Sequence, residues 1–166
     1  MLMHKSRMSI HPRCLRLIAP LVLIATLGTG LAADNPFLGT WKLNEGKSHI
    51  PSGAGKITSA VYSPAANDMI TITTDGVDAK GNPTHSEWTG KFDGKPYPVT
   101  GTPGVDNRTV EARGVRTLIA TNLKGVKPVS KGKIEVSADG KSRTLDLTGT
   151  TPDGKPYKAT YFYDKQ

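Results

Sequence analysis

Short runs of alternating apolar and polar residues, separated by turn residues, are the feature that most constrains the fold of this chain. After residue 33 the apolar residues often recur at every second position, and not at the three- and four-residue spacing of a helix. Gly, Pro, Asn and Asp interrupt these runs, as they do at tight turns. Short strands joined by turns are typical of all-β sandwiches and barrels.

The runs predict about ten strands, and Asp-Gly pairs or a Gly-Asn-Pro sequence separate several of them. The predicted strands are Phe37–Leu43, Lys56–Tyr62, Met69–Thr74, Thr84–Phe92, Tyr97–Thr100, Thr109–Arg113, Val115–Asn122, Lys133–Ser137, Arg143–Thr148 and Tyr157–Tyr163. The predicted turns are Lys80–Pro83, Asp93-Gly94, Asp139-Gly140 and Asp153-Gly154.

Alternation also assigns the faces of two aromatic strands. Trp88 and Phe92 fall on one face of their strand, and Tyr157, Tyr161 and Tyr163 share a face of the last strand. We interpret these five residues as candidate ligand-binding residues that line one interior, with tyrosine hydroxyls as polar groups. The alternative is that the same rings simply fill a core.

Residues 1–33 have the pattern of a signal peptide. Four basic residues precede the apolar run Leu17–Leu27, and small residues follow at Gly30–Ala33. The run is shorter than the roughly 20 residues of a membrane-spanning helix. The sequence therefore predicts a periplasmic or secreted protein, with residues 34–166 as a single β-barrel domain and no transmembrane segment after cleavage.

Removal of this segment changes the charge and cysteine content that bear on function. The segment carries four of the 22 Lys and Arg residues and none of the 14 acidic ones, so the net charge falls from +8 to +4. This weak charge argues against nucleic acid as a partner. The only cysteine, Cys14, is removed as well, so the mature domain has no disulfide and no thiol chemistry.

The mature sequence shows little that indicates catalysis. His85 and Glu87 lie on one face of a predicted strand, which would make half a metal site without a third ligand. No hydrolase, zinc-protease or phosphate-loop motif is present. We therefore expect no catalytic residue, no metal, no cofactor and no enzymatic activity.

The two ends of the mature sequence resemble a known superfamily. Phe37–Leu43, with Gly39 and Trp41, is similar to the Gly-x-Trp strand of lipocalins and to the first strand of fatty-acid-binding proteins. The ending Tyr163–Lys165 resembles the end of fatty-acid-binding proteins, and the whole mature chain resembles small bacterial exported proteins of unknown function. The resemblance implies a calycin fold, that is, an antiparallel meander β-barrel of about 8–10 strands.

The resemblance also assigns roles and shows departures. Trp41 would pack across the closed end of the barrel, where Gly39 would permit close approach of the backbone. Lipocalins place an arginine near the last strand against this tryptophan, whereas the last arginine here is Arg143. Fatty-acid-binding proteins carry an arginine two residues before the terminal tyrosine, a position held here by Tyr161. The absence of that arginine predicts that neutral ligands bind at least as well as fatty acids.

Three hypotheses for function follow, of which the first is the leading one. The first is an exported lipocalin-like binding protein for a small, partly apolar molecule. The second is a cell-envelope interaction protein with a filled barrel, whose partner is an envelope lipid or glycan. The third is a hydrolase of envelope material. A cavity inside the barrel would separate the first from the other two.

We predict that protein isolated from the producing cell begins at Asp34 or Ala33, because the small residues that a signal peptidase requires end there. Intact-mass spectrometry measures this directly. A mass that retains residues 1–33 would contradict the export hypothesis.

Overall fold

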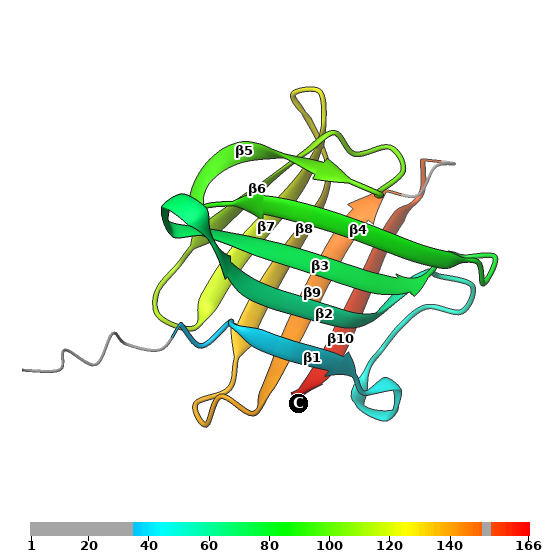
Figure 1. Cartoon of the computed structure of the whole chain (residues 1–166). Coiled ribbons are helices and arrows are strands. Elements are labelled where there is room, and N and C mark those ends of the chain that lie inside the picture. The colour runs from blue at the N-terminus through cyan, green and yellow to red at the C-terminus, as the bar shows by residue number, and fades with distance from the viewer. Residues whose placement is uncertain (1–34, 151–153) are drawn as a thin grey trace, which may run out of the picture. The chain divides into compact units, whose positions relative to one another are not determined.

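In the computed structural model, which describes residues 35–150 and 154–166, ten antiparallel strands close into a barrel (Figure 1). The strands are β1 (Gly39–Leu43), β2 (Lys56–Ala65), β3 (Met69–Val77), β4 (Pro83–Gly90), β5 (Asp93–Thr100), β6 (Asn107–Ala112), β7 (Thr117–Lys124), β8 (Lys127–Val136), β9 (Ser142–Thr150) and β10 (Pro156–Lys165). Two short 3₁₀ turns, η1 (Glu45–Lys47) and η2 (Ala66–Asp68), follow β1 and β2. Within these residues no helix is long and apolar enough to cross a membrane.

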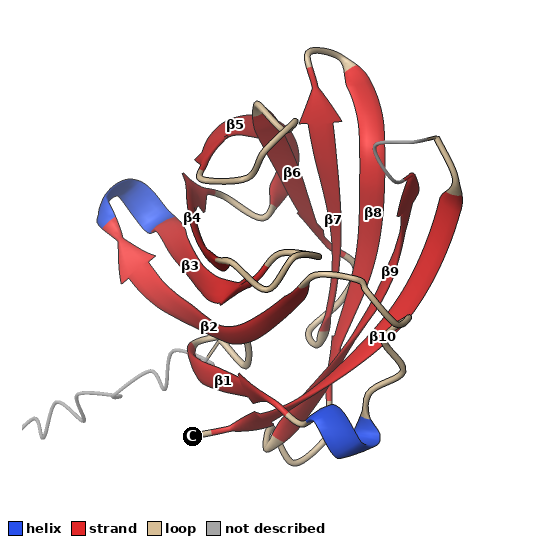
Figure 2. Cartoon of the chain, turned by 90° about the vertical axis from the view of Figure 1, so that its right-hand side faces the viewer, coloured by secondary structure: helices blue, strands red, loops and turns tan. Residues whose placement is uncertain are grey.

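The topology is a closed meander. Each strand pairs with the next one along the chain, and β1 pairs with β10 to complete the ring (Figure 2). This arrangement confirms the predicted all-β, antiparallel meander barrel. The predicted signal peptide, its cleavage site and Asp153 lie outside the described residues.

All ten predicted strands are present, and the differences lie at their ends. The predicted turn at Asp93-Gly94 instead falls at the start of β5, where the register with β6 shifts between Asp93 and Pro96. Gly94 has a φ of +77°, and the Asp93 carboxylate accepts a hydrogen bond from the Lys95 amide at 3.0 Å. The same residue chemistry that suits a hairpin tip therefore forms an irregularity inside a strand pair.

The alternation of the strands places one apolar face in the interior, as expected of an antiparallel sheet with one wet side. Trp41, Trp88 and Tyr163 are the largest fully buried side chains. The buried core also contains Phe37, Ala60, Tyr62, Ile72, Val99, Val110, Leu118, Ile134, Val136, Ala159 and Tyr161. Strand alternation thus predicts the buried positions of Trp88, Tyr161 and Tyr163.

The contact between the first and last strands closes the barrel. β1 pairs with β10 at only three positions, Trp41 with Lys165 among them. The buried Trp41 ring donates from Nε1 to the Phe37 carbonyl at 2.8 Å. Gly39 has a φ of +114°, and a Cβ there would lie 2.9 Å from Lys165 Cε. The short closing strand therefore combines a buried aromatic side chain with a glycine that a larger residue could not replace without strain.

We predict that Trp41→Ala lowers the free energy of unfolding by about 3–5 kcal/mol, because it removes a fully buried aromatic ring and leaves a cavity. Urea unfolding measures the loss. Val126→Ala is the control, since Val126 is 96% exposed and its truncation should cost about 0.5 kcal/mol or less. Equal, small losses in both variants would show that the Trp41 ring does not support the closing strand.

Candidate ligand-binding site

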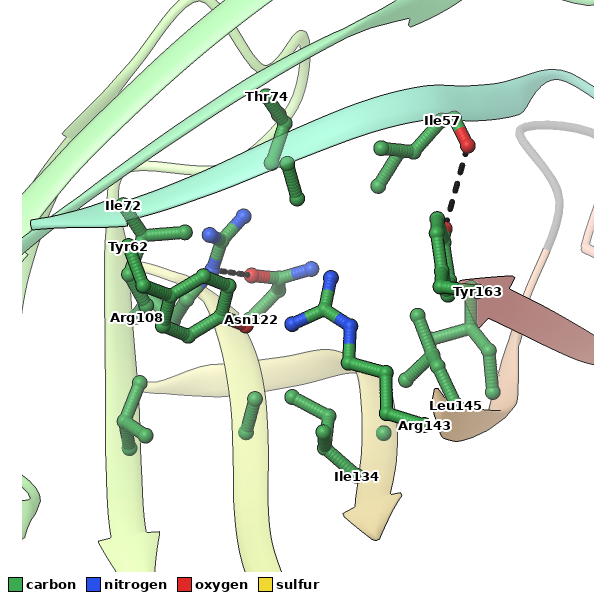
Figure 3. A pocket seen from close by; sticks show the side chains of 15 residues that line it. Ile57, Tyr62, Ile72, Thr74, Arg108, Asn122, Ile134, Arg143, Leu145 and Tyr163 are labelled. Carbon is green, nitrogen blue, oxygen red and sulfur yellow. Dashed lines mark hydrogen bonds between the residues drawn. The ribbon is translucent and has the colours of Figure 1, made fainter. Parts of the chain in front are cut away.

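The interior of the barrel contains a partly open cavity of about 100 Å³ (Figure 3). Its walls come from seven strands, β2, β3 and β6 to β10. The lining residues are Ile57, Ala60, Tyr62, Ile72, Thr74, Arg108, Val110, Ala120, Asn122, Gly132, Ile134, Arg143, Leu145, Leu147 and Tyr163. Most of this surface is aliphatic, and the polar groups on it are few.

Arg143 is the most deeply buried polar residue of the cavity. Arg143 shares the inward face of β9 with Leu145 and Leu147, because residues two apart on a strand point to the same side. Its side chain therefore points to the inside of the barrel and is only 4% exposed. The guanidinium carbon lies 5.0 Å from the centre of the Trp41 ring, and 4.7 Å from the centres of the Tyr62 and Tyr163 rings. These three faces provide cation–π stabilisation of a desolvated charge.

Two nitrogens of the Arg143 guanidinium have no hydrogen-bond partner among the described residues. Nε and Nη1 are both buried, and no described residue accepts a hydrogen bond from either. An unsatisfied buried donor costs about 1–3 kcal/mol, and more when it carries charge. The rings do not remove this cost, because a ring face interacts with the cation while the N–H donors lie in the guanidinium plane.

A second arginine enters the same cavity from β6. Arg108 donates from Nε to Asn122 Oδ1 at 2.7 Å, and the Asn122 amide donates to Ser130 Oγ at 2.9 Å. Burial lowers the pKa of Arg108, although an arginine remains charged at neutral pH. The carbonyl of Arg108 also accepts a hydrogen bond from Trp88 Nε1 at 3.0 Å, which fixes the backbone at this point.

The cavity holds two cationic side chains and no anionic one. No Asp or Glu belongs to its lining, and neither Arg108 nor Arg143 has a salt-bridge partner among residues 35–150 and 154–166. Figure 3 shows both guanidinium groups directed into the cavity, with Asn122 beside Arg108. A buried charge is ordinarily paired, so this interior has an unbalanced positive charge.

The predicted tyrosine row divides between the cavity and the barrel closure. Within the described chain, Tyr163 is the one of the five candidate ligand-binding residues that lines the cavity. The Tyr163 hydroxyl donates to the Ile57 carbonyl, and that of Tyr161 donates to the Gly55 carbonyl, each at 3.2 Å. The first bond connects β10 to the start of β2, and the second connects β10 to the residue that precedes β2. The hydroxyls of Tyr161 and Tyr163 therefore link β10 to the region where β2 begins. Tyr157 lies on the same face of β10, nearer the start of that strand.

Trp88 and Phe92 lie in a separate aromatic cluster. Their rings stack 6.4 Å apart, and Trp88 meets Tyr97 edge-on at 5.9 Å, as Phe92 meets Phe37. A Cβ at Gly90 would lie only 2.5 Å from the Trp88 ring, so the packing here is tight. β4 and β5 pair at just two positions beside this cluster. The cluster thus fills the interior where these two strands diverge.

The histidine considered as half of a metal site has another partner. His85 Nδ1 lies 2.7 Å from Asp75 Oδ1 of the neighbouring strand, in an exposed pair. In the part of the chain that the structure describes, no group of three His, Cys, Asp or Glu side chains could hold a metal ion.

The two arginines are the site residues that the sequence prediction missed. The expectation that neutral ligands bind at least as well as fatty acids used arginine positions of other families, and Tyr161 does stand where the fatty-acid-binding arginine would be. The structure brings Arg143 of β9 against the Trp41 ring. Alternation contained the signal, because Arg143 shares a face with Leu145, and Arg108 with Val110.

Comparison with known proteins finds three solved structures that are similar to this chain at low sequence identity. No protein-family model and no curated protein matches the sequence. Among solved structures, the chain is similar to the redesigned β-barrel mFAP1 bound to DFHBI, with 16% identity, a TM-score of 0.45, and coverage of 78% of this chain and 95% of that one. It is similar to EF1p2_mFAP2b bound to DFHBI, with 12% identity, a TM-score of 0.48 and coverage of 79% and 94%. It is also similar to a variant of the fluorescent protein UnaG, with 19% identity, a TM-score of 0.47, and coverage of 78% of this chain and 95% of that one. What those barrels bind is a property of those proteins.

We predict that the stability of the protein falls as pH rises above about 10 and that Tyr163→Phe weakens this dependence. Burial raises the pKa of Tyr163, against the opposing positive charge of Arg143. Above the ordinary tyrosine pKa of about 10, the unfolded chain releases a proton that the native state keeps. Each such proton makes unfolding more favourable by about 1.4 kcal/mol per pH unit.

Urea unfolding of both proteins between about pH 8 and pH 11.5 measures this difference. At the lower pH the variant should lose about 1 kcal/mol, the contribution of the hydroxyl bond to Ile57. Parallel curves for the two proteins would mean that the Tyr163 hydroxyl ionises in the native state as freely as in water.

Proposed function

We propose that this protein is an exported binding protein that holds a small, partly apolar molecule inside its barrel. The observation that carries the proposal is the cavity itself, with its aliphatic wall and a few converging polar groups. Ligand sites in proteins have this composition, in which apolar surface provides affinity and a small number of polar groups fixes orientation. The signal-peptide pattern of residues 1–33 supports a periplasmic or secreted location.

The volume of the cavity sets the size of the ligand. At about 100 Å³ it is smaller than the roughly 300–1,000 Å³ of pockets for drug-sized ligands. It is closer to the volume of about 150 Å³ of an engineered apolar cavity in a protein core that takes up benzene. The proposed ligand is therefore a single ring or a short chain, and not a long fatty acid.

A second candidate function is an envelope interaction protein with a filled barrel, acting on lipid headgroups or glycans. The cluster of Phe37, Trp88, Phe92 and Tyr97 favours it, because these rings occupy interior space that a larger ligand would need. The two candidates differ in whether any molecule enters the remaining cavity.

We predict that Ala120→Leu abolishes the uptake of single-ring probes, because Ala120 lines the cavity and the larger side chain would occupy it. Isothermal titration calorimetry with benzoate and benzamide measures binding. Thr121→Leu is the matched control, since the next residue along β7 points to the opposite face of the sheet.

The cavity is supported as the ligand site if the probes bind to wild type and to Thr121→Leu, and bind to Ala120→Leu with at least about tenfold lower affinity. A tenfold loss of affinity corresponds to about 1.4 kcal/mol of binding free energy. If neither probe binds wild type, the filled-barrel function replaces the binding function.

A further inference from the structure

The buried guanidinium of Arg143 requires an explanation that barrel closure does not supply. Long apolar side chains could fill the same space between Trp41, Tyr62 and Tyr163 without leaving donors unsatisfied. Replacement of buried charges by well-packed apolar groups is often neutral or stabilising in proteins. The structure nevertheless places a permanent cation there, 4% exposed, whose Nε and Nη1 donate to no residue in the described part of the chain. Such free, charged donors in a cavity fit an acceptor that comes from outside the chain.

The second cation strengthens this argument. Arg108 lines the same cavity and uses Nε on the neutral oxygen of Asn122, which orients the guanidinium without neutralising it. Within the described residues, neither arginine meets a carboxylate. Two like charges in one apolar space raise each other's energy, and an anion placed between them would lower both.

The remaining wall specifies the rest of the ligand. Ile57, Ile72, Ile134, Leu145 and Leu147 offer aliphatic surface and no hydrogen-bonding side chain. An inorganic anion would leave this surface in contact with water, whereas an acid with a short apolar body would cover it. The volume of about 100 Å³ restricts that body to a ring or a few carbons.

From this combination we propose that the ligand is a small organic carboxylate, with its carboxylate bound by Arg108 and Arg143 and its apolar part against the aliphatic wall. The inference rests on the proposed binding function and names its ligand class. Planar guanidinium groups match carboxylates in geometry and form charge-assisted hydrogen bonds with them. The two arginines lie on β6 and β9, and neither lies on β10, where Tyr161 holds the position of the fatty-acid clamp. This site therefore differs from the clamp that the sequence resemblance would have placed on the last strand.

The test compares two probes of equal shape that differ in charge. Calorimetric titration with benzoate and benzamide should show that wild type prefers benzoate by at least about tenfold. Arg143→Met should lose this preference and retain benzamide binding, because methionine keeps the apolar volume and removes the donors. Arg113→Met is the matched control, since Arg113 is exposed and paired with Glu111, and it should behave as wild type.

Two further measurements keep the inference falsifiable if Arg143→Met is poorly folded. Arg108→Met should also reduce the preference for benzoate, and raising the benzoate concentration should raise the melting temperature of wild type more than the same concentration of benzamide. In urea without ligand, Arg143→Met should unfold at the same or a higher midpoint than wild type, because it removes two buried donors that no described residue satisfies.

The outcomes separate the two claims. Equal binding of benzoate and benzamide to wild type, unchanged in both arginine variants, overturns the carboxylate inference and leaves the binding function in place. Failure of both probes to bind wild type overturns both. A preference for benzoate that survives in Arg143→Met and Arg108→Met would place the anion elsewhere and overturn the inference as stated.

Discussion

The closure of the sheet between β1 and β10 is the constraint on which the rest of the structure depends. β1 has five residues and meets β10 at three positions, fewer than any other strand pair except β4 with β5. Residues 34–166 contain no cysteine that could reinforce it. Packing of Trp41 and the hydrogen bonds from the Tyr161 and Tyr163 hydroxyls to β2 and the residues before it carry the closure instead. An open sheet would admit water to Arg143, so the desolvated interior exists only because this edge is shut.

The tyrosines of β10 show how one side chain can serve two requirements. Tyr163 presents a ring face to the Arg143 guanidinium and sends its hydroxyl to the backbone of β2. The ring stabilises the cation, and the hydroxyl connects β10 to β2 where the five-residue β1 no longer lies between them. Because both contacts involve the same ring, the position of the cation and the position of the barrel edge are coupled. Site geometry and fold stability are therefore not independent in this barrel.

The fold could be predicted from the sequence better than the site, and the reason is physical. Alternation and turn residues are local, so all ten strands and the buried faces of Trp88, Tyr161 and Tyr163 could be inferred from the chain. The site requires knowing which strands face each other across the barrel. Arg108 and Arg143 lie on strands that do not pair, and only closure brings them to one cavity. Their inward direction could be inferred from Leu145 and Val110, but their meeting could not.

Aromatic rings, and not a carboxylate, hold Arg143, and this has a consequence for the binding of a ligand. A resident carboxylate would neutralise the guanidinium and occupy its donors, which would leave nothing for another anion. The faces of Trp41, Tyr62 and Tyr163 hold the cation while leaving Nε and Nη1 unpaired in its plane. Orientation is thus fixed before a ligand arrives, so less freedom is lost on binding. The cost is a less stable empty barrel, which is the trade-off expected where a fold keeps a charged group ready for a partner.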